Sequence, residues 1–277
     1  MTIGQALREA AALLGETSDT ARLDAEVLMA YALGVTRSDL LLRHMRDAAP
    51  PGFAGLIERR RRHEPVAHII GQQEFYGLPF RVTPDVLIPR GDSEVLVEAA
   101  LAACPDARRV LDCGTGSGAL LLAVLANLPK ATGAGIDRSD AALAIAAINA
   151  TALDLQDRAR MVAANWDEPG WTAKIDPPYD LVLANPPYVE TEADLAPSVR
   201  DYEPGGALFA GLQGLDAYRS LIPQLPNILS KNGMAFLEIG ATQADPVSAI
   251  AGDSGFAVRV HRDLANRPRV LELSGNT

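Results

Sequence analysis

The sequence predicts an α/β protein in which a doubly wound, mostly parallel sheet follows a small all-α region. Three observations support this prediction. From residue 92 onward, strand-like and helix-like segments alternate, which is typical of a parallel sheet with helices on both faces. In the first seventy residues, apolar residues keep helical spacing and strand signals are lacking. The last two strand-like segments are joined by a short turn, which predicts an antiparallel edge hairpin.

A helical N-terminal domain is expected over residues 1–72. Gly15 and Gly34 each follow an apolar run with helical periodicity, so each is expected to end a helix. The proline pair Pro50-Pro51 precedes a third such run. The three predicted helices cover Ala6–Leu14, about Asp19–Leu33, and Phe53 into the arginine run Arg59–Arg62. Helices this short are expected to form a bundle with a small core.

Residues 73–91 are expected to form a β-hairpin or extended connector, because aromatic and β-branched residues there are interrupted by glycine and proline. The main domain is expected over residues 92–277, with seven strands. Its predicted strands are 109–112, 133–137, 160–163, 179–184, 234–239, 256–261 and 269–273, and its predicted helices are 93–103, 119–127, 141–152 and 215–229.

The formal net charge of −10 argues against a protein that grips long nucleic acid, because phosphate contacts supply most of that affinity. We therefore expect no stable nucleic-acid binding, although a local basic patch stays possible. The run Arg59–Arg62 is either a solvated helix face or a docking stripe for an RNA-rich or acidic partner.

The positions of cysteine, histidine and apolar residues indicate which kinds of protein this chain is not expected to be. Cys104 and Cys113 form no Cys-x-x-Cys pair and the four histidines are scattered, so we expect neither a disulfide framework nor a metal site. The chain has no run of eighteen apolar residues, and its N-terminus lacks a signal-peptide pattern. We expect a cytoplasmic protein without a membrane span.

The first motif, Val110–Ala119, reads as a strand, a glycine-rich turn and a helix. Glycines allow a tight turn and close approach of a ligand. Asp137 ends the next strand, where a carboxylate can bind ribose hydroxyls. The same spacing also fits a dinucleotide site, or a tight turn with no ligand. Asp112 favours S-adenosylmethionine, because its carboxylate would repel a pyrophosphate and attract an amino-acid ammonium.

The second motif, Asn185-Pro186-Pro187-Tyr188, directly follows the apolar strand 179–184. Two prolines make a stiff platform at the carboxyl end of a strand, where open α/β sheets bind ligands. The Asn185 side-chain oxygen and the Pro186 backbone oxygen can each accept one N–H of a planar NH₂ group and aim its nitrogen at a methyl group. Tyr188 would supply an aromatic wall. The combination predicts methylation of an amino group, with Asn185, Pro186 and Tyr188 as the catalytic residues.

Trp166 lies between the two motifs, after a predicted strand. It is expected either to stack on the adenine ring of the cofactor or to pack in the core.

Several stretches resemble one family. They are Glu64–Gly71, Glu74–Gly77, Leu87–Glu94, the glycine turn, Asn185–Tyr188, Tyr202–Pro204 and Leu237–Gly240. With these residues, nearly the whole chain is similar to the release factor glutamine methyltransferases, which modify the glutamine of a Gly-Gly-Gln loop. The resemblance implies a Rossmann-like enzyme that uses S-adenosylmethionine to methylate the N5 amide nitrogen and releases S-adenosylhomocysteine. It also implies that the helical domain docks the release factor. A cytoplasmic monomer is expected.

The resemblance also assigns residues. Implied cofactor contacts are Gly114, Thr115, Gly116, Ser117, Gly118, Asp137, Trp166 and Asn185, beside Asp112. The implied glutamine pocket is Asn185, Pro186, Pro187 and Tyr188, with Phe75 as either a pocket wall or hairpin core. Three positions depart from the family pattern: Gly91 replaces a usual proline, Cys113 replaces an aliphatic residue, and Asn266–Val270 replaces a glycine-rich turn.

Three alternative functions remain. Adenine-N6 or guanine-N2 methylation of nucleic acid would use the same platform, but requires a flipped base in duplex DNA. A nicotinamide-dependent oxidoreductase would leave Asn185–Tyr188 without a role. A binding module without activity would not need an intact acceptor platform.

Overall fold

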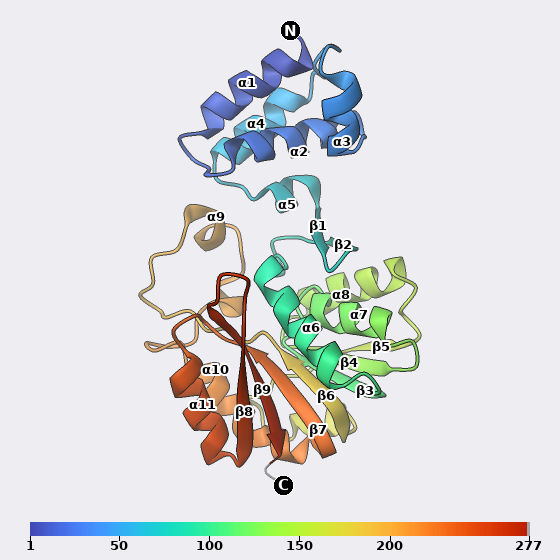
Figure 1. The fold of residues 1–277 in the computed structure, drawn as a ribbon, viewed down its shortest axis with the longest axis vertical. Helices are drawn as coiled ribbons and strands as arrows, with labels where there is room; N and C mark the ends of the chain where they lie inside the picture. The colour runs from blue at the N-terminus through green and yellow to red at the C-terminus, as the bar shows by residue number, and fades with distance from the viewer. Residues whose placement is uncertain (276–277) are drawn as a thin grey trace. The chain divides into compact units, whose positions relative to one another are not determined.

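The computed structural model describes residues 1–275 and divides into two compact units (Figure 1). The helical unit combines Met1–Gln72 with a later segment, Leu195–Glu203. The sheet unit combines Gln73–Asp194 with the chain from Pro204 onward. The helical unit is therefore assembled from two stretches that are far apart in sequence.

Three helices of the helical unit match the predicted ones: α1 (Ile3–Leu14), α2 (Ala21–Leu33) and α4 (Phe53–Arg61). Thr2 begins α1 with a reciprocal capping box to Gln5, and Gly34 ends α2 in the left-handed conformation, with φ +67°. The sequence reading missed four short elements: α3 (Arg37–Asp39), the π-helical turn Leu40–His44, α5 (Val66–Ile70) and α9 (Pro197–Arg200). Each is too short to show a clear apolar period.

The arginine run is engaged in ion pairs inside the helical unit. Arg60 pairs with the buried Asp24 at 2.7 Å, with 12% and 9% of the two side chains exposed. Arg59 pairs with Glu64 at 2.5 Å. Arg61 and Arg62 both pair with Glu58. Arg60 therefore has a structural role, whereas Arg59, Arg61 and Arg62 stay exposed, as expected of a solvated helix face. A docking role for these three stays untested.

Strands β1 (Gln72–Phe75) and β2 (Leu78–Arg81) form a two-stranded sheet. Tyr76 and Gly77 join them with φ of +52° and +73°, the backbone that a tight two-residue hairpin turn requires. The rings of Phe75 and Phe80 meet edge to face at 6.2 Å inside the sheet unit's core.

The seven-stranded sheet is confirmed, in the order β5-β4-β3-β6-β7-β9-β8. Strands β3 to β7 run parallel, β9 is antiparallel to β7, and β8 is antiparallel to β9. The predicted antiparallel edge hairpin is therefore present. The bounds are β3 (Arg109–Cys113), β4 (Thr132–Asp137), β5 (Ala159–Ala163), β6 (Tyr179–Ala184), β7 (Leu229–Glu238), β8 (Phe256–Arg262) and β9 (Pro268–Gly275).

Helices cover both faces of this sheet (Figure 1). One face packs on α6 (Glu94–Ala103), α7 (Ala119–Asn127) and α8 (Asp140–Ala152), and the other on α10 (Asp216–Leu221) and α11 (Ala244–Asp253). Successive β6 residues alternate between the two cores: Leu181 and Leu183 face the first, Val182 and Ala184 the second. Cys113 is fully buried in the second core, where it acts as a small apolar residue.

The predicted helix 215–229 is wrong. Only α10 is α-helical, and a 3-10 segment, Ile222–Asn227, follows it. Pro223 and Pro226 explain the change, because proline has no N–H to donate to the carbonyl four residues earlier. Strand β7 starts at Leu229, five residues before the predicted start at 234. Helix α11 was not predicted from the sequence.

Candidate functional site

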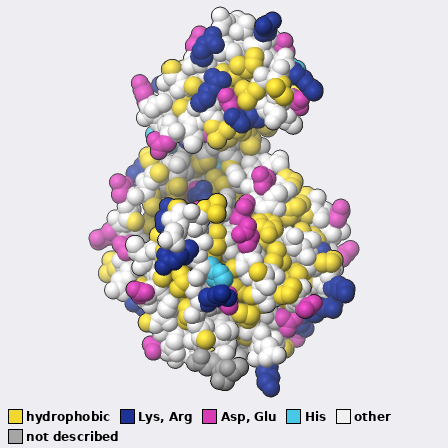
Figure 2. All heavy atoms as spheres, viewed as in Figure 1, with side chains coloured by type: hydrophobic (Ala, Val, Ile, Leu, Met, Phe, Trp, Pro, Cys, Tyr) yellow, Lys and Arg dark blue, Asp and Glu magenta, His cyan; other side chains and the backbone are white. Residues whose placement is uncertain are grey.

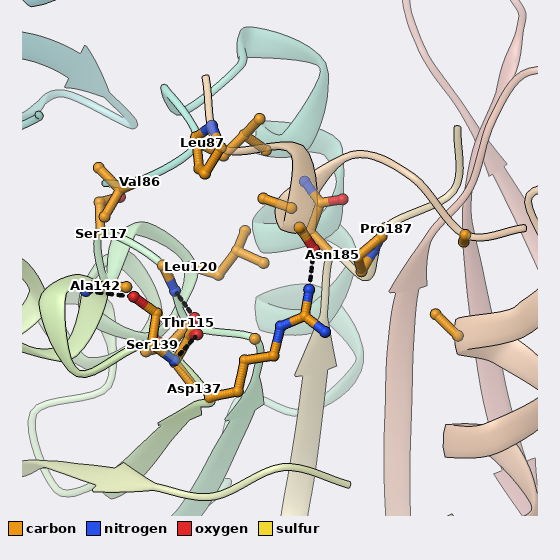
Figure 3. Close-up of a pocket in the computed structure, with 18 of the residues that line it drawn as sticks. Val86, Leu87, Thr115, Ser117, Leu120, Asp137, Ser139, Ala142, Asn185 and Pro187 are labelled. Carbon is orange, nitrogen blue, oxygen red and sulfur yellow. Dashed lines mark hydrogen bonds between the residues drawn. The ribbon is translucent and has the colours of Figure 1, made fainter. Parts of the chain in front are cut away.

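The chain reverses its direction across the sheet between β3 and β6, so the carboxyl ends of these neighbours frame a switch point. Cys113 is in register with Ala184, and Gly114 and Asn185 follow these two residues directly. The glycine turn and the Asn-Pro-Pro-Tyr tip therefore emerge side by side. A cavity of about 400 Å³ opens there and is lined by both. In Figure 3, Asn185 and Pro187 face Thr115 and Asp137 across it.

The glycine turn is shaped by left-handed residues and tied to Asp137. Gly114 and Gly116 have φ of +77° and +53°, which side chains rarely tolerate. The Gly116 N–H donates to Asp137 Oδ2 at 3.0 Å, and the Ser139 N–H donates to Asp137 Oδ1 at 2.9 Å. Each carboxylate oxygen keeps a lone pair for a ligand hydroxyl. Asp137 lines the cavity, as a ribose acceptor must.

Trp166 lies where the cavity meets the second core: it lines the cavity and packs against that core. Its ring lies 3.4 Å from the position that a Cβ would take at Gly114, so the indole lies directly against the glycine turn. Gln224 fixes the Trp166 backbone by donating to its carbonyl at 3.0 Å. The open glycine backbone, the carboxylate and the indole together fit a nucleoside.

Asp112 differs from the expected direct contact, because it does not line the cavity. Its side chain lies beneath the turn and is 1% exposed, and Thr115 Oγ1 donates to its Oδ2 at 2.6 Å. Among the described residues, Oδ1 has no hydrogen-bond partner. Burial raises the pKa of Asp112 to about 7. A cation placed near this carboxylate would be stabilised, which fits the ammonium of an amino acid.

The Asn-Pro-Pro-Tyr tip divides between the cavity and the protein interior. Asn185 and Pro187 line the cavity, whereas Pro186 and Tyr188 do not. Gly118 is also outside the lining, because it packs where a Cβ would meet Leu122 and Ala146. The Tyr188 hydroxyl instead donates to Glu238 Oε1 at 3.2 Å, so the expected aromatic wall has no support in the lining.

Phe75 lines the cavity and is also part of the core, with 1% of its surface exposed. Asn149, on α8, holds the hairpin against the glycine turn. Its Nδ2 donates to the carbonyls of Ser117 at 2.8 Å and Arg81 at 3.1 Å, and its Oδ1 accepts the Arg81 N–H at 2.8 Å. Asn149 thus links the hairpin to the glycine turn by direct hydrogen bonds.

Four residues around the site were not predicted from the sequence. Ser93 Oγ accepts from Asn185 Nδ2 at 3.4 Å, and Glu238 accepts from Tyr188. Gln243 Nε2 donates to the Tyr188 carbonyl at 3.1 Å. Arg138, next to Asp137, donates to the Gly206 carbonyl at 2.8 Å and lines the cavity. Only the resemblance motifs around Ser93 and Glu238 pointed to these positions, and they named no role.

Basic and acidic side chains are interspersed on the face shown in Figure 2. Within residues 1–275, no cluster of three or more His, Cys, Asp or Glu side chains could hold a metal ion. Across the same residues, every helix is too short or too polar to cross a membrane.

Two family models match the sequence: the PrmC N-terminal domain over residues 5–71, and the methyltransferase small domain over residues 91–201. The release factor glutamine methyltransferase of Cereibacter sphaeroides is 41% identical over 279 residues, which cover 98% of both chains. That of Caulobacter vibrioides is 41% identical over 261 residues, covering 91% of this chain and 89% of the relative.

Among solved structures, a methyltransferase from Pyrococcus furiosus shares the fold with a TM-score of 0.55. It is 14% identical and covers 79% of this chain and 99% of that chain. At this identity the match supports the fold alone.

Proposed function

The chain belongs to the release factor glutamine methyltransferase family, and we propose that it methylates the side-chain amide nitrogen of the glutamine in the Gly-Gly-Gln loop of class I release factors. S-adenosylmethionine is the proposed methyl donor. The observation that carries the proposal is the register of β3 and β6, which brings the glycine turn and the Asn-Pro-Pro-Tyr tip to one cavity.

The cavity residues fit the proposed donor. The left-handed Gly116 has no atom within 4 Å of where a Cβ would stand, so its backbone is open to a ligand. Asp137 is available to the ribose hydroxyls and Trp166 to the adenine face. Asp112, buried beneath the turn, would stabilise the ammonium group electrostatically without touching it. When bound, S-adenosylmethionine supplies a methyl group on a positively charged sulfur and leaves as S-adenosylhomocysteine.

The Asn-Pro-Pro-Tyr tip is proposed to promote methyl transfer by orienting the glutamine amide nitrogen of the substrate. A carboxamide nitrogen is a weak nucleophile, because its lone pair is delocalised into the carbonyl. Asn185 Oδ1, in the cavity lining, is proposed to accept one of its N–H groups, and the backbone carbonyl of Pro186, which lies outside the lining, the other. The two hydrogen bonds would aim the nitrogen at the methyl carbon and stabilise the positive charge that grows during attack. The rigid prolines keep these acceptors in place. Solvent takes the proton that the nitrogen loses, so no strong base is needed.

The helical unit is proposed to dock the release factor. The match of residues 5–71 to a family-specific domain model supports this role, because the methyltransferase model covers only residues 91–201. We also propose that the enzyme acts in the cytoplasm, since release factors act on ribosomes. The proposed oligomeric state is a monomer, which the elution volume on size-exclusion chromatography tests.

A methyl-transfer assay with labelled S-adenosylmethionine tests the function. The acceptors are purified release factor, the same factor with its loop glutamine replaced by alanine, ribosomal RNA and DNA. Label is expected on the intact factor alone. Label on RNA or DNA without label on the factor would overturn the proposal in favour of nucleic-acid methylation.

A further inference from the structure

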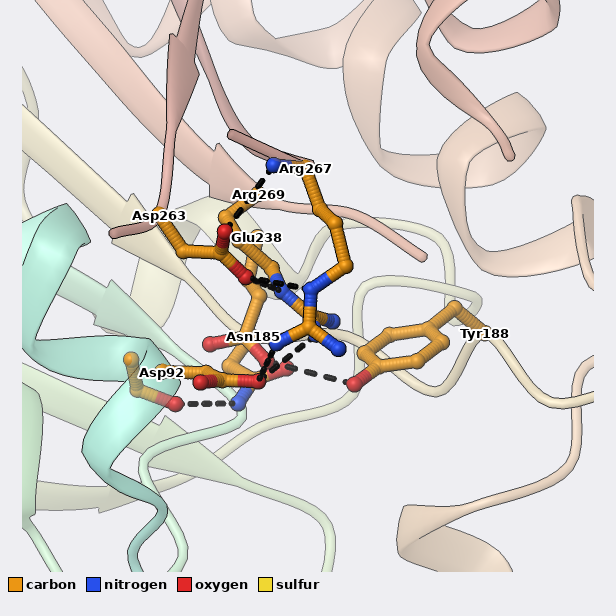
Figure 4. Close-up of polar contacts among 8 residues, drawn as sticks. Asp92, Asn185, Tyr188, Glu238, Asp263, Arg267 and Arg269 are labelled. Carbon is orange, nitrogen blue, oxygen red and sulfur yellow. Dashed lines mark hydrogen bonds and ion pairs between the residues drawn. The ribbon is translucent and has the colours of Figure 1, made fainter. Parts of the chain in front are cut away.

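A buried carboxylate lies behind the Asn-Pro-Pro-Tyr tip, at the end of β7. Glu238 is 1% exposed. Its Oε1 accepts the Tyr188 hydroxyl at 3.2 Å, and its Oε2 is buried without a hydrogen-bond partner of normal geometry among the described residues (Figure 4). Burial raises the pKa of Glu238, whereas the hydroxyls of Ser93 and Tyr188 lower it. A buried ionisable group costs stability, so its presence here calls for an explanation.

Ser93 connects this carboxylate to the catalytic asparagine. Ser93 is 4% exposed, and its Oγ accepts from Asn185 Nδ2 at 3.4 Å. A hydroxyl has one proton and two lone pairs. When a lone pair of Ser93 Oγ accepts the hydrogen bond from Asn185 Nδ2, the hydroxyl proton of Ser93 is free to be donated to a different acceptor. Glu238 is the carboxylate whose pKa the Ser93 hydroxyl lowers, and its Oε2 lacks another partner.

The direction of the Asn185 amide matters for the reaction. The oxygen and nitrogen of an asparagine side chain are similar in size, so hydrogen bonds decide which one faces a cavity. If Ser93 accepts, the NH₂ group of Asn185 faces the interior and Oδ1 is left for the cavity. If Ser93 donated to Asn185, Oδ1 would be turned inward and the acceptor amide would meet an NH₂ group.

We propose that Glu238 is a positioning residue, which takes the Ser93 proton so that Asn185 presents its side-chain oxygen to the acceptor amide. The same carboxylate holds Tyr188, so it anchors both ends of the tip. This inference rests on the proposed function, because it assigns Asn185 the acceptor role described above. A carboxylate suits the task because it only accepts hydrogen bonds when ionised.

Two near-isosteric variants test the relay. Ser93→Ala removes the acceptor for Asn185, and Glu238→Gln places a donor where one carboxylate oxygen stood. Each is expected to lower kcat for transfer to the release factor by about 10- to 100-fold, because small misplacements of reacting groups have effects of this size. The KM for the factor and the Kd for S-adenosylmethionine are expected to stay within about threefold. The double variant is expected to fall no further than the worse single one.

Control variants separate positioning from stability. Tyr218 is fully buried and donates to the backbone carbonyl of the same Glu238 at 2.8 Å. Tyr218→Phe therefore removes a matched buried hydroxyl and is expected to lower Tm without changing kcat. Ser93→Thr retains the hydroxyl and is expected to keep kcat within about threefold of the unmodified chain.

An NMR measurement tests the positioning without activity. In the [¹⁵N]asparagine-labelled full chain, the Asn185 NH₂ signal is identified by its loss in Asn185→Asp. One of its protons is expected to exchange slowly, and to exchange fast in Ser93→Ala and Glu238→Gln. Unchanged exchange, or kcat losses no larger than in Tyr218→Phe, would overturn the relay. Failure of the unmodified chain to methylate the factor would overturn the proposed function instead, and the exchange rates would still decide on the relay.

Discussion

Arg269, on the last strand, forms an ion pair with Asp92, with 2.7 Å between Nη2 and Oδ2 (Figure 4). Asp263 accepts from Arg269 Nε at 3.1 Å and so holds the guanidinium in place. Asp92 directly follows Gly91, where the family resemblance leads us to expect proline. The edge hairpin therefore anchors the turn that directly precedes α6.

Gly91→Pro is expected to raise the free energy of unfolding by about 0.4–1 kcal/mol, because proline restricts the unfolded chain. Arg90 is already extended, with ψ 142°, as the residue before proline must be. Nothing lies within 4 Å of a Cβ at Gly91. Urea denaturation measures the change. Gly91→Ala should give a smaller gain, and a lower midpoint for Gly91→Pro would show that the site needs glycine.

Asn185→Ala is expected to abolish transfer, with at least about a 10²–10³-fold loss in kcat, because the acceptor amide loses one of its two proposed orienting oxygens. Binding of S-adenosylmethionine is expected to change by no more than about tenfold. Single-turnover transfer of labelled methyl and calorimetric titration give the two quantities. Near-normal turnover would remove Asn185 from the mechanism.

Asp137→Ala is expected to weaken S-adenosylmethionine binding by roughly 1–3 kcal/mol, through the unpaired ribose hydroxyls. Asp140, three residues later, is exposed and lies outside the cavity lining. Asp140→Ala therefore serves as the matched control and should bind the cofactor almost normally. Calorimetry that gives equal affinities for both variants would contradict the ribose assignment.

Asp112 is expected to make stability depend on pH. Because burial raises its pKa from 3.8 to about 7, the folded chain holds a proton that the unfolded chain releases between these values. The free energy of unfolding should therefore fall as pH rises through this window, by up to about 1.4 kcal/mol per unit from this group. Asp112→Asn cannot titrate, so its profile should be flatter than that of the unmodified chain. Parallel denaturation profiles of the two proteins would refute this pKa.

Trp166 provides an optical test of the cofactor pocket. Of the two tryptophans, Trp166 lines the cavity and Trp171 is 2% exposed. S-adenosylhomocysteine is expected to change the fluorescence by stacking on Trp166. Trp171→Phe should keep most of this change and Trp166→Phe should lose it. The reverse pattern would place the adenine elsewhere.

Local patterns predicted the framework of the site. The strand before Asn185 was predictable because a continuous apolar run is followed at once by two prolines, and the glycine turn because its glycines open a helix. The helix predicted over 215–229 failed because Pro223 and Pro226 outweigh the apolar period there. The contacts of Asn185 with Ser93 and of Tyr188 with Glu238 were not predictable, since they join segments that only the sheet topology brings together.

The burial of Asp112 is a further feature that could not be predicted from the sequence. Its place before the glycine turn predicted a carboxylate near the cofactor. The sequence could not show that Thr115 covers it, because that contact depends on how the turn folds back over the strand.

The segment Leu195–Glu203 belongs to the helical unit although it lies far along the chain from the rest of that unit. It folds with residues 1–72, and its Tyr202 hydroxyl donates to the Arg62 carbonyl at 2.7 Å. A shortened chain that begins at residue 73 would keep Tyr202 but lose this carbonyl. A chimaera that exchanges the helical unit between relatives therefore needs both residues 1–72 and residues 195–203 from the same relative. Joining two chains at a single position after residue 72 would separate the two stretches.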